Sequence, residues 1–271
     1  MALNIELIRK RLNNLKSQTK KSKDTWKPEP GKTKIRIVPY KFQPDNPFIE
    51  LFFHYEFGGK GKRTFLSLKT FGEKDPIVEF CDKLKRTGEK EDWLMGVKHE
   101  PKMRTFAPIV VRGKEQEGVK FWGFGKTIYE KLLAVAENEA EWGDITDPTA
   151  GHDILVEFKS KEEVGKDYPE TDIQVLPSVT PLSKDKELVE KLLDEQKEIF
   201  EVYPKPTYEE LVEVLEKFLN PEEGDDVPEP SADEDDETPK KPESKKTPVK
   251  EGKEDVKQAF DKLFKDADAA K

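Results

Sequence analysis

Between positions 33 and 176, apolar and polar residues alternate in short runs, which is the pattern of β-strands buried on one face. In residues 33–38, Ile35 and Ile37 lie on one side while Lys34 and Arg36 lie on the other. The predicted strands are 33–38, 48–57, 63–68, 105–112, 119–124, 153–159 and 172–176. Turn residues at 58–61 and 113–118 join four of them into two predicted hairpins.

Elsewhere apolar residues recur every three or four positions, which predicts helices. Asp75 is a suitable N-cap, and Pro76 a suitable first residue, for a helix over 76–86. Further helices are predicted at 3–16, 126–141, 184–200 and 207–219, with a short amphipathic stub from Val256 to Phe264. The leucine-striped helix at 3–16 is too short to be stable alone, so we expect its stripe to contact a partner surface.

Several short strands with intervening helices predict an α+β protein, mostly β with α. The expected core is an OB-fold, a small Greek-key β-barrel, with helical embellishments; a β-sandwich is the alternative that the pattern leaves open. Three regions are predicted: a basic N-terminal arm (1–25), the folded core (26–220) and a disordered acidic tail (221–271) rich in Glu, Asp, Pro, Ser and Lys.

Charge is divided unequally along the chain. Residues 1–136 contain 29 Lys and Arg against 17 Asp and Glu, a net of +12; the remaining residues contain 19 against 40, a net of −21, and the two sum to −9. A basic front half with aromatic side chains among its cations predicts binding of a polyanion, which the acidic tail resembles. The alternative is an ordinary acidic protein with a solvated tail.

The sequence lacks the usual motifs of catalysis. It has neither a P-loop nor a G-x-S-x-G turn, and His54, His99 and His152 are scattered. A single cysteine, Cys81, excludes an intrachain disulfide and a multi-cysteine metal cluster. We therefore expect no enzymatic activity, cofactor or metal. Without an apolar run of roughly 20 residues or a signal peptide, we expect a cytoplasmic protein, in the host cell if the source is viral.

Cations and aromatic rings are interleaved most densely between residues 98 and 126. On a strand, Lys120, Trp122 and Phe124 would share one face, where bases stack on rings at about 1–3 kcal/mol each while cations bind phosphates. The alternative is that both rings face the core. The candidate nucleic-acid-binding residues, including a second wall near residue 65, are Arg36, Lys62, Arg63, Phe65, Lys69, Lys102, Arg104, Phe106, Arg112, Lys120, Trp122, Phe124 and Lys126.

These residues favour non-enzymatic binding of single-stranded DNA with weak sequence preference and strong salt dependence. A Trp122→Ala substitution is then expected to weaken DNA binding while the fold is retained. An RNA-binding or translational-repressor module would use the same surface. An acidic adaptor or chaperone would instead bind basic proteins through residues 233–237. A nuclease is a further alternative, but no carboxylate cluster has metal-site spacing.

Four segments carry a family resemblance: 26–40 (WKPEPGKTKIRIVPY), 47–54 (PFIELFFH), 105–113 (TFAPIVVRG) and 124–131 (FGKTIYEK). In their order and spacing, from about 26 to 219, the chain resembles the helix-destabilising single-stranded DNA-binding proteins of the T-even bacteriophages. The resemblance implies cooperative DNA binding in replication, recombination and repair. It also implies an OB-fold with a cationic cleft, lined by rings that would include Phe106, Trp122 and Tyr168.

The resemblance also implies roles for the two ends of the chain. In that family the basic arm binds the core of the neighbouring molecule, so that binding becomes cooperative. The residues that would do so here are Arg9, Lys10, Arg11, Lys16, Lys20 and Lys21. The acidic tail of the family recruits replication and recombination proteins and competes with DNA.

One departure from the family concerns zinc, which its members hold with one histidine and three cysteines. Here His54 lies in the corresponding strand, but Asp75-Pro76-Ile77-Val78 stands where a Cys-Pro-x-Cys pair would be. Cys81 alone does not replace three thiolates, so we predict that no zinc is bound. Apolar packing is expected to hold this region instead, through Ile77, Val78, Phe80 and Leu84.

Overall fold

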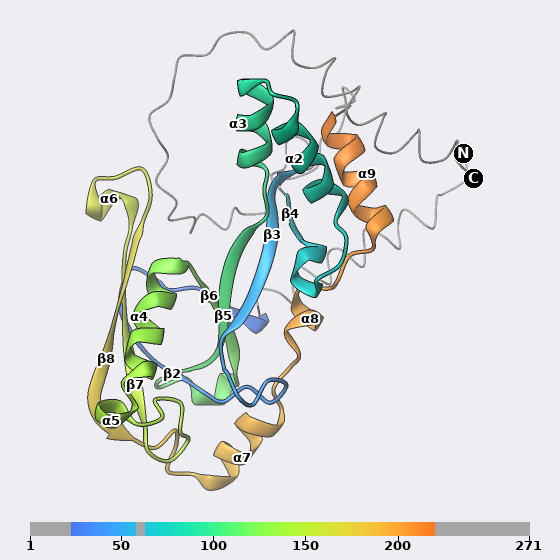
Figure 1. The fold of residues 1–271 in the computed structure, drawn as a ribbon. Helices are drawn as coiled ribbons and strands as arrows, with labels where there is room; N and C mark the ends of the chain where they lie inside the picture. Colours follow the sequence, from blue (N-terminus) through green and yellow to red (C-terminus); the bar gives the residue numbers. More distant parts are fainter. Residues whose placement is uncertain (1–22, 58–62, 220–271) are drawn as a thin grey trace, which may run out of the picture. The chain divides into compact units, whose positions relative to one another are not determined.

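The structure, a computed structural model, describes residues 23–57 and 63–219 (Figure 1). The predicted arm up to residue 22, the tail with its terminal stub, and Lys62 lie outside the described residues. Within them the chain forms two compact units. Unit 1 comprises residues 23–50 and 104–204, and unit 2 comprises residues 51–57, 63–103 and 205–219.

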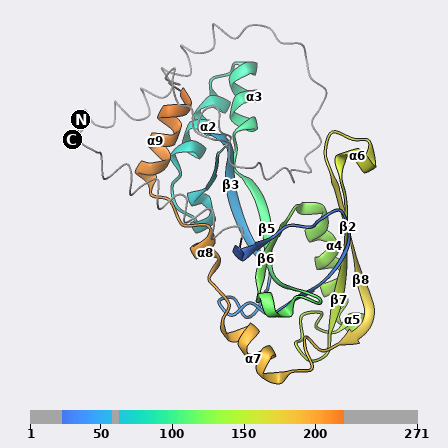
Figure 2. The same cartoon turned by 180° about the vertical axis from the view of Figure 1, so that it is seen from behind.

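Unit 1 is built on six β-strands, hydrogen-bonded side by side in the order β1-β6-β5-β2-β7-β8. The strands are β1 (Thr25–Trp26), β2 (Gly31–Ile37), β5 (Lys102–Val111), β6 (Lys120–Phe124), β7 (Gly151–Lys159) and β8 (Glu170–Thr180). Strand β2 pairs antiparallel with β5 and β7, as do β5 with β6 and β7 with β8, whereas β1 pairs parallel with β6. Ile35 sets the register at the centre, since it lies opposite Val111 on one side and Ile154 on the other. The long β7–β8 pair is seen clearly from behind (Figure 2).

The core of unit 1 follows from the alternation of side chains along these strands. Helix α4 (Lys126–Glu137) covers one sheet face with Ile128 and Leu132. The strand residues buried in the same cluster include Ile35, Ile37, Ala107, Ile109, Trp122, Phe124, Ile154 and Val156. On β5, Val110 instead joins a second cluster with Val38, Leu182 and Leu192. The central strand β5 is therefore buried on both faces.

Two predicted helices of unit 1 are each divided in two. The helix predicted at 126–141 consists of α4 and α5 (Glu139–Trp142), which Asn138 separates with a non-helical ψ of 59°. The helix predicted at 184–200 consists of α7 (Lys186–Asp194) and α8 (Ile199–Val202). Between the latter two, Gln196 donates to the Pro39 carbonyl at 2.8 Å and accepts from the Lys41 N–H at 3.0 Å. These hydrogen bonds to a segment distant in the sequence keep the residues between α7 and α8 from continuing the helix.

Three short elements of unit 1 were not predicted. They are the two-residue strand β1, the 3₁₀ turn η2 (Glu115–Glu117) and the single-turn helix α6 (Lys161–Val164) at the end of the β7–β8 pair. A capping box explains α6, since Ser160 accepts from the Glu163 N–H while the Glu163 carboxylate accepts from the Ser160 N–H.

Unit 2 combines a hairpin with three helices. Strand β3 (Ile49–Phe57) pairs with β4 (Arg63–Leu66), and the turn η1 (Leu68–Phe71) follows. Helix α2 (Pro76–Arg86) packs against both α3 (Lys90–Lys98) and α9 (Tyr208–Leu219). The predicted start of α2 is confirmed, with Asp75 as N-cap and Pro76 in the first turn. Ile77, Phe80 and Leu84 are buried as predicted, together with Phe57, Leu68, Cys81, Leu211 and Leu215.

Helix α3 was not predicted, and its composition explains why. Trp93 and Leu94 are about half exposed, at 49% and 50%, so the apolar residues of α3 do not mark a single buried face. The contact with α2 is made through Gly96, where an added Cβ would lie 2.8 Å from the Cys81 carbonyl oxygen. A helix that packs through a glycine leaves little hydrophobic periodicity in the sequence.

The α+β class is confirmed, since both units combine helices with β-structure. The expectation that the protein is mostly β is wrong, because helical residues outnumber strand residues in the described ranges. The sheet of unit 1 is mixed rather than wholly antiparallel. Among the described helices, none has both the length and the apolar character that crossing a membrane requires.

Candidate nucleic-acid interface

Two of the predicted stacking rings lie in the core. Trp122 is 1% exposed and Phe124 is 2% exposed; Trp122 makes an edge contact with Trp26 at 5.6 Å and a tilted contact with Phe124 at 4.8 Å. The reason is the position of β6 between β1 and β5, with Phe121 buried on its other face against Tyr40. The prediction that Trp122 and Phe124 present an exposed surface for bases is therefore wrong.

The exposure predicted for Phe106 is wrong as well. Its ring is 4% exposed and packs on Tyr203 at a centroid distance of 5.0 Å. The ring also lies close to Gly123, where an added Cβ would approach a ring carbon to 2.7 Å. Arg104 donates a hydrogen bond to the Gly123 carbonyl at 3.1 Å. A ring so nearly buried offers no surface on which a base could stack.

Arg36 and Arg112 hold unit 1 together from within. Both bind Oδ1 of Asp153, Arg36 through Nη2 at 2.8 Å and Arg112 through Nη2 at 2.7 Å. Arg36 also donates to the Thr180 and Asp147 carbonyls, and Arg112 to the Leu182 carbonyl. Burial lowers the pKa of Arg36, with Asp153 acting in the opposite direction. The prediction that these two guanidinium groups are available to phosphates is wrong, because protein groups already bind them.

The remaining predicted residues of unit 1 lie at or near its surface. Lys126 and Tyr168 are exposed, and Lys126 lies 3.4 Å from Glu130. Lys120 is largely covered and pairs with Glu117 at 2.5 Å. Arg104 is partly buried. For these four residues, contact with DNA stays a prediction.

In unit 2 the predicted residues Phe65, Lys69 and Lys102 are placed differently from one another. Phe65 lies opposite His54 in the hairpin and packs against the core of the unit. Lys69 is exposed, with its ammonium 4.7 Å from the centre of the Phe52 ring. Lys102 lies 5.9 Å from the centre of the Tyr55 ring. Arg63 belongs to β4, but its side chain is outside the described part.

Two ring–lysine pairs lie close to η1. Besides Lys69 over Phe52, Lys205 lies 4.6 Å from the centre of the Phe71 ring. Both rings are half-buried, and each has a lysine ammonium group over the ring. With the exposed Lys74, these residues form what we call the η1 surface, defined as Phe52, Lys69, Phe71, Lys74 and Lys205. Sequence reasoning identified only Lys69.

The local sequence fixes the shape of η1. Ser67 accepts from the Lys69 N–H as N-cap, and Gly72 ends the turn with φ of 67° in the left-handed region that glycine favours. Thr70 accepts the Phe52 N–H at 2.9 Å and so joins η1 to β3. The two rings of the η1 surface are thereby held by backbone geometry as well as by packing.

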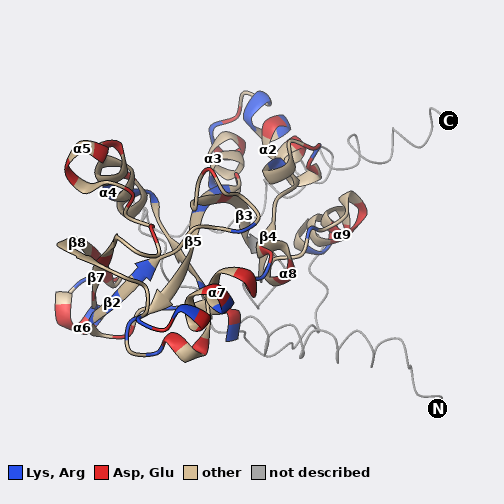
Figure 3. Ribbon diagram, turned by 90° about the horizontal axis from the view of Figure 1, so that it is seen from below, with Lys and Arg blue, Asp and Glu red and all other residues tan. Residues whose placement is uncertain are grey.

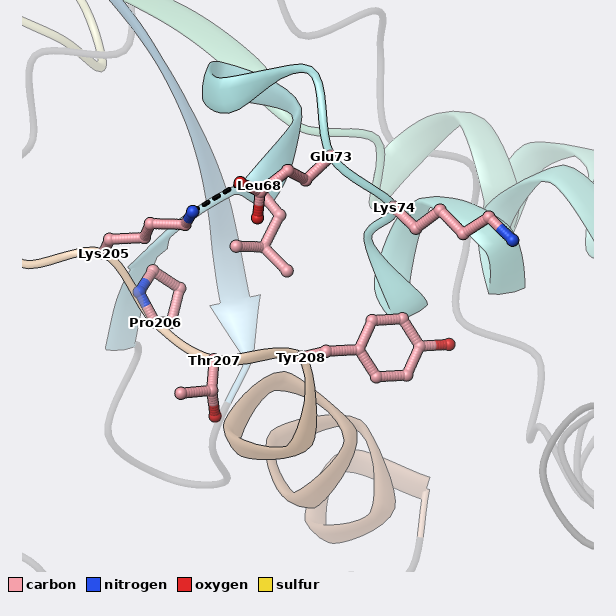
Figure 4. A pocket seen from close by; sticks show the side chains of 7 residues that line it. All are labelled: Leu68, Glu73, Lys74, Lys205, Pro206, Thr207 and Tyr208. Carbon is pink, nitrogen blue, oxygen red and sulfur yellow. Dashed lines mark hydrogen bonds and ion pairs between the residues drawn. The ribbon is translucent and has the colours of Figure 1, made fainter. Parts of the chain in front are cut away.

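A hollow of about 480 Å³ opens beside η1, between Leu68 and the segment that leads into α9 (Figure 4). On its rim Lys205 donates to Glu73 at 2.5 Å, while Lys74 points away from this ion pair. Tyr208 donates to Glu79 at 2.9 Å, and burial together with this bond raises the pKa of its hydroxyl. The hollow thus has an apolar floor with lysines at its edge.

The charges of unit 2 are segregated by element. The exposed side of α9 carries Glu209, Glu210, Glu213 and Glu216, whereas lysines and an arginine predominate near the end of α2 (Figure 3). In the described ranges, no group of three or more His, Cys, Asp or Glu side chains is placed to hold a metal ion. The chemistry that the η1 surface offers is therefore stacking and charge attraction.

The missed ring Phe52 left a signal in the sequence. Leu51 and Phe53 are buried, so strand alternation directs the residue between them outward. A large aromatic ring on the outward side of a strand leaves apolar area exposed to solvent, which is a feature of binding surfaces. Lys205 left no such signal, because it lies far along the chain from Phe71.

Comparison with known families places this chain beside DNA-binding proteins. The family described as "gp32 DNA binding protein like" matches residues 29–220, which include all of the described chain beyond its first six residues. A search of curated proteins found no match.

Proposed function

Because this chain belongs to the gp32-like family of DNA-binding proteins, we propose that it is a non-enzymatic protein that binds single-stranded DNA. In this proposal it coats the strand cooperatively during replication, recombination and repair of DNA, with little regard to sequence. The observation that supports it most directly is the η1 surface, where half-buried rings lie beneath lysine ammonium groups.

The η1 surface suggests how an unpaired strand is bound. A base that slides between an ammonium group and a ring replaces the cation–π contact by stacking, worth about 1–3 kcal/mol per base. The displaced lysine remains next to the phosphate that the base carries with it. Each phosphate so neutralised releases counterions, and the affinity therefore falls as salt concentration rises.

Phe52→Ala tests this arrangement. We expect it to weaken binding of an oligo-dT by about 5- to 150-fold, which corresponds to the loss of one stacked base. The measurement is fluorescence anisotropy of labelled oligo-dT at fixed salt concentration. Lys69→Gln should in addition reduce the slope of log affinity against log salt by about one.

Phe42→Ala is the matched control, because Phe42 is an exposed ring of unit 1 that lies outside the η1 surface. It should leave the affinity within about twofold of the unsubstituted chain. Equal losses for Phe42→Ala and Phe52→Ala would remove the reason to place DNA at η1. A matched RNA oligomer that binds as tightly as the DNA would favour the RNA-binding alternative.

The rest of the proposal rests on the family rather than on the described residues. We propose an OB-fold core, a DNA surface that also includes Lys102, Arg104, Lys126 and Tyr168, and self-association through Arg9, Lys10, Arg11, Lys16, Lys20 and Lys21. Replication and recombination proteins are the proposed partners of the tail. Cooperative binding would appear as a steeper titration on poly-dT than on short oligomers, and substitution of the arm cations should abolish that difference.

The acidic block Asp233–Glu237 suggests that the tail competes with DNA for the lysines of the core. Deletion of residues 221–271 is therefore expected to raise DNA affinity at low salt by about tenfold, because like charges no longer repel the strand. The measurement is the same anisotropy titration at two salt concentrations. A chain that lacks only residues 251–271 retains the acidic block and serves as control; an unchanged or lower affinity of the longer deletion would refute competition.

A further inference from the structure

The carboxylate of Asp75 joins three segments of unit 2. Its Oδ2 atom accepts hydrogen bonds from His54 Nε2 at 2.9 Å, Ser67 Oγ at 2.6 Å and the Leu68 N–H at 2.9 Å. His54 belongs to β3, whereas Ser67 and Leu68 link β4 to η1. The side chain of His54 is fully buried and that of Asp75 almost so. An ionised carboxylate accepts only, so all three partners are donors.

The second oxygen of the same carboxylate caps a helix. Oδ1 of Asp75 accepts from the Ile77 N–H at 2.9 Å and the Val78 N–H at 3.2 Å, in the first turn of α2. Burial alone would raise the pKa of Asp75, but the hydrogen bonds lower it below its ordinary value. One side chain thus links β3, the β4–η1 connection and α2 through five hydrogen bonds.

The zinc that the family resemblance implies does not fit this place. Structural zinc takes four ligands, with cysteine thiolates foremost among them. Here the Nε2 atom of His54 is engaged by Asp75, and its Nδ1 atom, buried without a hydrogen-bond partner, is a single nitrogen. Cys81 is buried, with the pKa of its thiol raised by burial to about 12, and one cysteine does not supply the several thiolates that a structural zinc site of this kind uses.

We infer that Asp75 cross-links unit 2 in place of a metal, by hydrogen bonds that join β3, the β4–η1 connection and α2. In a zinc subdomain the metal supplies the cross-link that a small core lacks. In unit 2 the carboxylate supplies it, beside the buried cluster of Ile77, Phe80 and Leu84. Since Leu68 begins η1, Asp75 also positions the turn that carries Lys69 and Phe71.

The first test is metal content and thermal unfolding of the full chain, purified from cells grown with added zinc. We expect less than about 0.1 zinc per chain by mass spectrometry and no shift of Tm when EDTA or phenanthroline is added. About one zinc per chain, removed by chelator with a fall in Tm, would overturn the inference.

The second test is Asp75→Asn. The amide keeps the shape, but its NH₂ group must face either the three donors at Oδ2 or the two helix N–H groups, so we expect Tm to fall by about 5–10 °C. Asp82→Asn is the control, because Asp82 is a half-exposed aspartate of α2 whose partner Lys85 also binds Glu100. Equal Tm values for the two variants would overturn the inference.

Ser67→Ala covers the case in which Asp75→Asn does not fold. It removes one donor to Oδ2 and leaves the carboxylate with His54 and Leu68, so we expect a smaller fall in Tm, of about 2–5 °C. If the Ser67→Ala variant had the same Tm as the unsubstituted protein, that result would count against the cross-link. Because every readout is stability or metal content, failure here is distinguishable from failure of the proposed DNA binding.

Discussion

Replacing Trp122 by alanine is expected to lower the free energy of unfolding by about 3–5 kcal/mol, the usual cost of removing a large ring from a core. The indole is 1% exposed and contacts Trp26 and Phe124, so its removal leaves a cavity lined by rings that cannot close around it. Urea denaturation followed by circular dichroism measures the change. Weaker DNA binding by this variant would follow from unfolding rather than from a lost stacking contact.

Trp93→Ala is the control for that experiment. Trp93 has the same side chain, but it is half exposed on α3, and its loss should cost no more than about 1 kcal/mol. If Trp122→Ala retained full stability and lost DNA affinity, the ring would have to lie at a surface, contrary to its place between β1 and β5.

The second large effect is expected for Asp153→Asn, at about 3–5 kcal/mol of unfolding free energy. This change removes the negative charge that Arg36 and Arg112 share. It leaves the two guanidinium groups close together, with Glu115, 3.9 Å from Arg112, as a more distant carboxylate partner. The side chain of Arg36 is fully buried, so water does not replace the lost charge. Urea denaturation again provides the measurement.

Asp172→Asn is the matched control for this second prediction. Asp172 lies in the same unit, and its ion pair with Lys131 is exposed, so its loss should cost at most about 1 kcal/mol. Should Asp153→Asn prove equally mild, the two arginines would be satisfied by backbone carbonyls alone, and the shared carboxylate would contribute little to stability.

Local periodicity predicted most elements of this chain, and the family resemblance is confirmed. Strand alternation and the Asp75–Pro76 helix start depend only on residues that are close in the sequence, so both can be recognised from the sequence alone. The burial of β6 is different, because it depends on β1 and β5 as neighbours and on Tyr40 beneath Phe121. Nothing within residues 120–124 distinguishes a ring that faces the core from one that faces a ligand.

The candidate site was harder to predict than the fold for the same reason. From its strand alone, Arg36 is predicted to be a cation available to a ligand. Its structural role becomes visible only from its hydrogen bond to Asp153 of β7. Conversely, no local pattern singles out Phe71, and only the contact with Lys205, a residue distant in the sequence, makes it part of a cationic surface. Contacts between distant segments decided both cases.

Unit 2 draws its residues from two stretches of chain, 51–103 and the segment after Pro204. That division sets the boundaries for any fragment meant for crystallisation or binding work. A fragment that stops at Pro204 loses Leu211 and Leu215 from the buried cluster, along with Lys205. An excised 51–103 peptide lacks the same two leucines and should not fold unaided. A useful shortened protein therefore ends no earlier than Leu219.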